Sequence, residues 1–161
     1  MLLETRQFGT MEIVNEDIIQ FPRRILGFEG RERYVIIEPV DCQPFRWLQC
    51  VDAPDLTFVI VNPLVFFPDY RVAVHAKEVA DIGVDDPSGV EIVVIITIPS
   101  QIDQMSANLQ GPILINTSNR IAKQLVLTNS DYTIEHSITE QLTRMQLRNA
   151  KHPMATVELT R

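Results

Sequence analysis

The chain has 161 residues, of which 45% are hydrophobic and 22% charged, a composition typical of one soluble globular domain and not of a disordered chain. The N-terminus lacks the apolar stretch of a secretory signal, and no apolar run reaches the roughly 18 residues of a membrane span. We therefore expect a cytoplasmic protein without a membrane association, in which Cys42 and Cys50 are free thiols.

The net charge of −7 is unevenly distributed along the chain. Residues 35–119 contain eleven acidic and three basic residues, which gives this stretch a charge of −8. An acidic body repels phosphate, so direct nucleic-acid binding is not expected, whereas a basic protein partner would be attracted. The alternative is that the acidity only maintains solubility.

Short apolar segments separated by turn residues fill the first half of the chain. Residues 3–8 alternate in polarity up to Gly9, and the extended pattern resumes at 11–14, which predicts a hairpin. The loop that begins at Phe21 and Pro22 carries apolar residues that we expect to be buried, namely Ile25, Leu26 and Phe28. Further strands are predicted at 34–37, 45–51, 58–61, 64–67 and 70–74.

The most apolar segment of the chain is 90–98, where dense Val and Ile predict a buried strand that Pro99 ends. Before it, the spacing of Val79 and Ile82 predicts a helix over 76–82 of two turns at most, with Gly83 as its terminator. Alternation places apolar residues on both faces of strand 90–98, so both faces should be covered. The two sets are Ile92, Val94, Ile96 and Ile98, and Glu91, Val93, Ile95 and Thr97.

Residues 112–115 and 121–127 flank a polar turn and predict a second hairpin. With about nine or ten short strands in total, the chain is expected to form a mostly β protein, either a barrel or a sandwich. We predict a small antiparallel β-barrel-like domain over residues 1–132, with one short helix, followed by a C-terminal extension over 133–161 that is helical and amphipathic.

The helical prediction for the extension depends on the spacing of its apolar residues. Ile134, Ile138, Leu142 and Met145 fall on one helical face, Ser137 and Glu140 form a possible capping box, and Pro153 is expected to end a helix of about 12 to 15 residues. One interpretation is that this helix covers an open end of the barrel. The other is that it covers a partner groove and can be displaced.

Residues able to carry chemistry are few. His75, His136 and His152 are isolated, which argues against a metal site, and neither a glycine-rich phosphate loop nor a nucleophile turn is present. Asp52 and Asp55 could form a carboxylate dyad or cation site, but a solvated turn explains them more simply. Residues 66–70 form either an exposed aromatic binding edge or the rim of the core. No cofactor is expected.

Several short sequence blocks follow one another along the chain in a characteristic order. They are Phe21-Pro22, Gly27-Phe28-Glu29, Trp47-Leu48-Gln49, Asp52-Ala53-Pro54-Asp55-Leu56, Asn62-Pro63, Phe66-Phe67-Pro68-Asp69-Tyr70 and residues 107–116. In these blocks the chain resembles FliW, the flagellar assembly factor family, over roughly residues 3–132. It departs from that family at Arg24, where a small residue is more usual, and in the extension 133–161.

The resemblance implies a small, non-enzymatic, β-barrel-like protein of the cytoplasm that binds flagellin and sequesters the RNA-binding translational regulator CsrA, which relieves repression of flagellin synthesis. Under this hypothesis the acidic middle of the chain faces CsrA and the aromatic edge receives flagellin. The predicted partner-binding residues are Phe66, Phe67, Asp69, Tyr70, Asp52, Asp55 and Asn108. The alternative function is a small-ligand or metal-binding β-barrel enzyme, which a deep polar pocket lined by His75 or the acids would favour.

Overall fold

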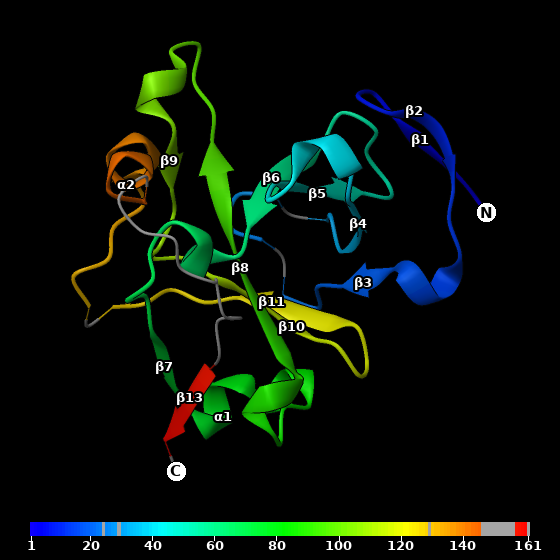
Figure 1. Ribbon diagram of the computed structural model, residues 1–161. Helices are drawn as coiled ribbons and strands as arrows, with labels where there is room; N and C mark the ends of the chain where they lie inside the picture. The colour runs from blue at the N-terminus through cyan, green and yellow to red at the C-terminus, as the bar shows by residue number, and fades with distance from the viewer. Residues whose placement is uncertain (24, 29, 129, 146–156, 161) are drawn as a thin grey trace.

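The computed structural model describes residues 1–161 except 24, 29, 129, 146–156 and 161. The described strands are β1 (Leu2–Thr5), β2 (Gly9–Glu12), β3 (Ile19–Gln20), β4 (Arg33–Ile37), β5 (Arg46–Cys50), β6 (Thr57–Val61), β7 (Val72–His75), β8 (Val90–Thr97), β9 (Ser106–Ala107), β10 (Ile113–Asn116), β11 (Ile121–Gln124), β12 (His136–Ser137) and β13 (Val157–Thr160). The α-helices are α1 (Ala76–Val79) and α2 (Ile138–Met145) (Figure 1). No helix in the described part of the chain is long and apolar enough to span a membrane.

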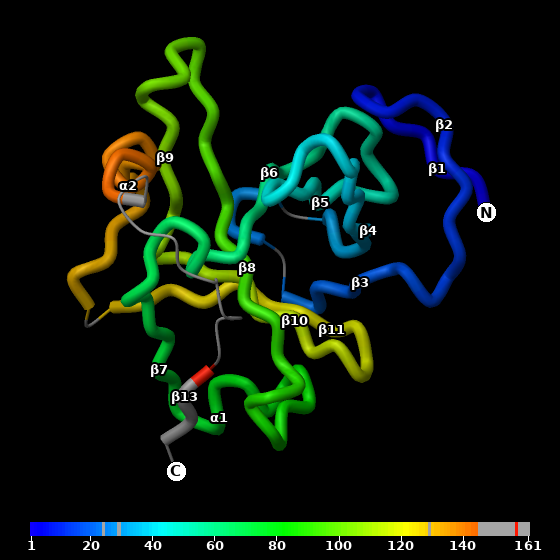
Figure 2. The backbone as a smooth tube through the Cα atoms, viewed as in Figure 1, coloured from blue at the N-terminus to red at the C-terminus, as the bar shows by residue number. Residues whose placement is uncertain are grey.

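Seven strands close into a barrel in the order β3-β4-β5-β6-β8-β10-β11, with β11 returning to β3. The prediction of a mostly β, barrel-like fold is confirmed. The closing pair β11–β3 is parallel, as is a separate pair β7–β13, so the architecture is mixed and not purely antiparallel. Strands β9 and β12 extend the sheet beyond β8. The hairpin β1–β2 at the N-terminus forms a sheet of its own, which packs through Leu3 against Val35 and Ile37 of β4 (Figure 2).

Strand β8 is covered on both faces, as its composition predicts. Val93 lies in a cluster to which all seven barrel strands contribute, which places that cluster inside the barrel. Ile92 and Val94 lie in a second cluster that packs beneath β7 and α1. Because the strand ends at Thr97, Ile98 lies in the following loop with half its surface exposed, and its predicted place on the buried face is wrong.

The two predicted hairpins form, at β1–β2 and β10–β11. The predicted short helix forms as α1 and a following 3₁₀ turn, and Gly83 ends it with a left-handed φ of 74°. The strand predicted at 64–67 is wrong. Asn62 caps a 3₁₀ turn at Pro63–Val65 by accepting the Leu64 N–H at 3.1 Å, with Pro63 preset for the first position.

In the loop after Pro22, Ile25 is buried as expected, but Leu26 is 65% exposed and Phe28 is 36% exposed, so the predicted burial of these two residues is wrong. The chain reverses after Leu26 at Gly27, which has a φ of 88°, and the backbone N–H of Leu26 donates to the Gln124 side chain at 3.1 Å. This hydrogen bond fixes the main chain at Leu26, while the Leu26 side chain faces solvent. The structure does not describe Arg24, where the sequence departs from the family pattern.

Helix α2 begins where the capping pattern predicts. The Ser137 hydroxyl accepts the Glu140 N–H at 3.3 Å, and Ile138 is fully buried. Of the other residues on the predicted apolar face, Ile134 precedes the helix and is exposed, and Leu142 is 41% exposed. The side chain of Met145 and the predicted end at Pro153 lie outside the described residues. The short strands β12 and β13 were not predicted for this extension.

Candidate functional site

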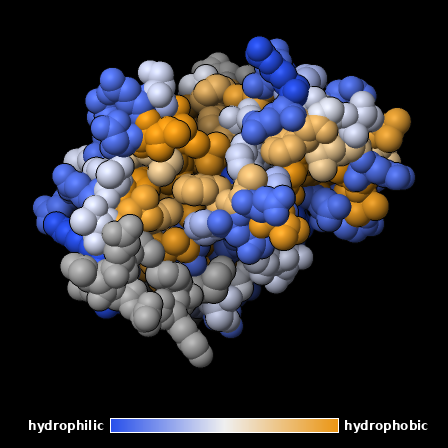
Figure 3. Space-filling view, turned by 45° about the horizontal axis from the view of Figure 1, so that its top comes forward, coloured by the Kyte–Doolittle hydropathy of each residue, from blue (hydrophilic) through white to orange (hydrophobic). Residues whose placement is uncertain are grey.

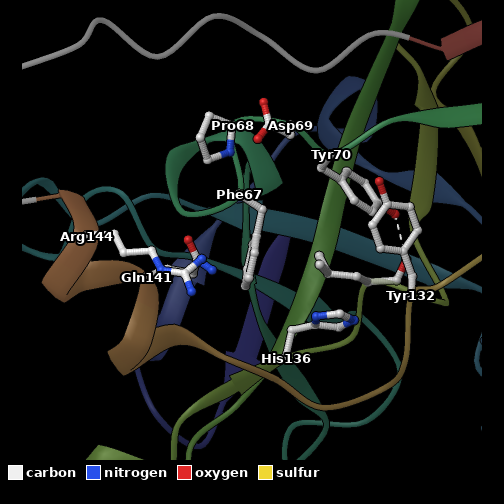
Figure 4. A pocket seen from close by; sticks show the side chains of 9 residues that line it. Phe67, Pro68, Asp69, Tyr70, Tyr132, His136, Gln141 and Arg144 are labelled. Atoms are coloured by element: carbon white, nitrogen blue, oxygen red, sulfur yellow. Dashed lines mark hydrogen bonds between the residues drawn. The ribbon is translucent and has the colours of Figure 1, made fainter. Parts of the chain in front are cut away.

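A pocket of about 240 Å³ opens where the loop after Val65 meets the segment that leads into α2 (Figure 4). It contains three of the predicted partner-binding residues together with residues from the C-terminal extension. The lining residues are Phe67, Pro68, Asp69, Tyr70, Leu109, Tyr132, His136, Gln141 and Arg144. The pocket therefore joins the barrel body to the extension.

Local hydrogen bonds fix the wall contributed by residues 67–70. The Phe67 N–H donates to the Pro63 carbonyl at 2.8 Å, and the Tyr70 N–H donates to the Phe67 carbonyl at 3.0 Å. The Tyr70 hydroxyl donates to the Leu109 carbonyl at 2.7 Å, deep in the protein. Burial raises the pKa of the Tyr70 phenol, so it stays neutral and keeps this bond. This wall is preformed.

Four aromatic rings make the pocket walls. The ring centroids of Phe67 and His136 lie 5.8 Å apart at 79°, and those of Tyr70 and Tyr132 lie 4.7 Å apart at 55°. Burial lowers the pKa of His136, and its Nε2 accepts the Thr133 N–H at 2.8 Å, which requires an unprotonated nitrogen. At neutral pH the walls are therefore uncharged aromatic surface.

Charged and polar groups stand at the rim. Asp69 is exposed on the loop, while Gln141 and Arg144 extend from α2 toward Phe67 (Figure 4). Figure 3 shows that apolar side chains gather in a partly hollowed area on one face of the molecule. An aromatic cavity with a mixed-charge rim is typical of a surface that receives side chains of a protein partner.

The described part of the chain gives no support to a metal site. The described residues contain no group of three or more His, Cys, Asp or Glu placed to hold a metal ion. His75 caps α1, where its Nδ1 accepts the Lys77 N–H at 3.4 Å. His152 lies outside the described residues. His75, which would favour the alternative enzyme if it lined a deep polar pocket, therefore has a capping role.

The remaining predicted site residues lie elsewhere. Phe66 is buried and stacks on Phe45 with ring centroids 5.9 Å apart, so it belongs to the core. Asp52 forms a bidentate ion pair with Arg33, and Asp55 lies 3.9 Å from Arg6 across an exposed surface. These two acids border a different, open cavity near Phe28.

Asn108 has a structural role next to the pocket. Its side-chain oxygen accepts the Gly111 N–H at 2.9 Å, and its own N–H donates to the Ile95 carbonyl at 2.9 Å. These bonds hold the backbone that presents Leu109 to the pocket. Asn108 itself does not line the cavity.

Sequence reasoning missed Tyr132, His136, Gln141 and Arg144. The sequence does show two aromatic rings, Tyr132 and His136, just before the helical pattern. Their role in the pocket depends on contact with residues 67–70, more than sixty positions earlier in the chain. Strand β12 creates that contact by pairing with β9, as His136 opposes Ala107.

Comparison with known proteins gives a consistent result. Residues 2–138 match the sequence model described as FliW protein. The chain belongs to the FliW family. A flagellar assembly factor FliW from Alkaliphilus metalliredigens is 41% identical over 147 residues, covering 91% of each chain, and one from Caldanaerobacter subterraneus is 40% identical over 143 residues, covering 88% of this chain and 95% of the relative. A crystal structure of the flagellar assembly factor FliW superposes with a TM-score of 0.80 at 33% identity, covering 86% of this chain and 96% of the other.

FliW proteins are flagellar assembly factors and not enzymes, so the predicted family and the absence of an enzymatic role are both confirmed. The match to residues 2–138 is slightly longer than the predicted 3–132. It includes Tyr132 and His136 but ends at the first residue of α2. The FliW family region therefore supplies the aromatic walls of the pocket, whereas Gln141 and Arg144 at its rim lie beyond that region.

Proposed function

We propose that this protein is a cytoplasmic flagellar assembly factor that binds flagellin and sequesters CsrA, thereby relieving repression of flagellin synthesis. The observation that carries the proposal is the FliW match over residues 2–138 together with the superposition at a TM-score of 0.80. In this scheme, accumulated flagellin occupies FliW. Export of flagellin frees FliW to capture CsrA, and flagellin translation resumes.

The aromatic pocket is the proposed flagellin-contacting surface. Flagellin ends are helical and apolar in this family context, and an amphipathic helix docks by inserting apolar side chains into a groove. Phe67 offers a half-buried ring at the pocket wall, and Tyr70 and Tyr132 continue that wall. Asp69 and Arg144 at the rim would orient a helix through its polar residues.

Exposed acids are the proposed CsrA-facing groups. Several acids of the middle region already have basic partners within the chain, as Asp81 does with Lys123 at 3.2 Å and Arg23 at 3.1 Å. Such paired acids contribute little to an external field. Asp41, Asp85 and Asp103 are exposed, and no ion pair to them is found among the described residues, so they are better placed to attract a basic protein.

A reconstitution with three purified proteins tests the proposal. We expect this chain and CsrA to co-elute in size-exclusion chromatography, flagellin to form its own complex with the chain, and excess flagellin to release CsrA. A labelled flagellin-leader RNA added to the mixture reports whether CsrA is sequestered from RNA. Failure of the chain to bind either protein would refute the proposal, and binding of flagellin alone would refute the regulatory half.

A further inference from the structure

The end of the chain adds a strand to the barrel body. Strand β13 pairs in parallel with β7, from Val157 opposite Val72 to Thr160 opposite His75. Among the described residues these two strands form a sheet of their own, so the ladder partner of β7 comes from the C-terminus itself. Figure 1 shows β13 beside β7 and α1, away from α2. An edge of β7 thus accepts an extended segment.

The accepting edge combines backbone hydrogen bonding with burial of one apolar side chain. Val157 is only 3% exposed and packs in the same cluster as Val72, Val74 and Val79. On the other face of β7, Ala73 and His75 are exposed. An incoming strand must therefore carry an apolar side chain at the position opposite Val72. The residues directly before and after that position in the incoming strand face outward.

Only one of these two paired strands lies within the FliW family region. Strand β7 lies inside the matched residues 2–138, whereas β13 begins 19 residues after that match ends (157 − 138). Removing β13 would leave the family region with an unpaired strand edge over a buried apolar cluster. Such an edge is a ready site for an external strand.

We propose that this edge of β7 is a docking site for an extended segment of a partner protein, and that β13 occupies it as an intramolecular substitute. The sequence of β13, Val-Glu-Leu-Thr, indicates the chemistry of the partner: a parallel strand with apolar residues two positions apart and an acidic residue between them. This site is separate from the aromatic pocket and does not depend on its role.

The tether makes the occupant strongly competitive. Because β13 and β7 belong to one chain, β13 competes intramolecularly, and an external strand of equal intrinsic affinity binds only in proportion to the open fraction. Detaching β13 should therefore increase the affinity of a competing peptide, and fixing it in place should abolish binding. These opposite effects distinguish docking at this edge from binding elsewhere.

A fluorescein-labelled peptide of residues 155–161, Ala-Thr-Val-Glu-Leu-Thr-Arg, serves as the probe in fluorescence anisotropy with the full chain. Val157→Asp is expected to release β13 and to bind the probe at least tenfold more tightly than the wild type. Val40→Asp, at a position 84% exposed in the turn between β4 and β5, is the matched control and should behave as the wild type. A peptide with Asp in place of its Val and Leu should not bind.

A reversible lock provides the second test and does not depend on how Val157→Asp folds. Ala73 and Glu158 are register partners, and a cysteine pair at neighbouring strand positions roughly 5 Å apart can form a disulfide. In a Cys42→Ser background, oxidised Ala73→Cys/Glu158→Cys should bind the probe at least tenfold more weakly than its reduced form. Equal binding by the oxidised and reduced forms, or no binding by any variant, would overturn the proposal. A wild-type dimer that the lock abolishes would also overturn it, by assigning the edge to a second copy.

Discussion

Two adjacent phenylalanines provide a matched test of the aromatic pocket. Phe66 is 3% exposed and stacks on Phe45 in the core, whereas Phe67 is half-buried at the pocket wall. Truncating a buried phenylalanine to alanine costs roughly 3–5 kcal/mol because transfer free energy is lost and a cavity remains. For a chain of this size that corresponds to a fall in melting temperature of roughly 6–20 °C.

The exposed part of the Phe67 ring gains less from folding, so Phe67→Ala should reduce the free energy of unfolding by only about 1–2 kcal/mol. If the ring is an anchor for flagellin, the same variant should bind flagellin at least tenfold more weakly, a loss of about 1.4 kcal/mol. Phe66→Ala should show the reverse: a large loss of stability and nearly unchanged affinity in the folded fraction.

Thermal and chemical unfolding followed by circular dichroism measure the stability of both variants, and calorimetric titration with flagellin below the lower melting temperature measures affinity. Exposed Leu26, replaced by alanine, controls for loss of apolar surface outside the pocket. Unimpaired flagellin binding by Phe67→Ala, with a stability loss as large as that of Phe66→Ala, would show that residues 66–70 are only the rim of the core.

Three further outcomes follow from the same contacts. Asp85→Asn with Asp103→Asn should slow association with CsrA several-fold at 50 mM salt and have little effect at 500 mM in stopped-flow measurements, because ions screen exposed charges. A rate that does not vary with salt in the unmodified protein would refute the electrostatic role. Ser137→Ala should remove the N-cap of α2 at a cost of about 0.5–2 kcal/mol, seen as faster hydrogen exchange in α2 while the barrel strands keep their protection. Arg33 lowers the pKa of Asp52 by hydrogen bonding, so the pair stabilises the fold above the ordinary carboxyl pKa, and this contribution is lost as pH falls through the lowered value. Asp52→Asn should cost no more than about 1 kcal/mol at pH 7 and less at pH 2, and equal losses at both pH values would contradict this.

Dense β-branched runs made the barrel predictable from the sequence. Strand β8 carries enough Val and Ile on both faces to identify a buried central strand, and turn residues located the β10–β11 hairpin. Strands β3, β9 and β12 have two residues each, too few to show any periodicity, and they exist because neighbouring strands supply partners. Closure of the barrel through β3 and β11 is likewise a long-range pairing that no local pattern encodes.

The candidate site was predictable only on one side. Residues 67–70 were recognisable because a proline interrupts a run of aromatic residues. Which of the two rings, Phe66 or Phe67, lies in the core and which at the pocket depends on how the chain turns after Asn62. A strand would have placed the two rings on opposite faces by alternation. The 3₁₀ turn achieves the same separation by another route, with one ring in the core and the other at the pocket.

Helix α2 contacts the barrel through its first turn and shapes the pocket through its second turn. Ile138, at the first position of the helix, is fully buried, and the Thr139 hydroxyl donates to the Asp103 carbonyl at 2.8 Å, so the start of the helix is fixed to the barrel. One turn later, Gln141 and Arg144 line the pocket rim, and Leu142 remains 41% exposed. Substitutions in this second turn can change the charge and width of the pocket mouth without disturbing the core. The second turn of α2 is therefore the part of the described extension where the pocket mouth can change independently of the barrel core.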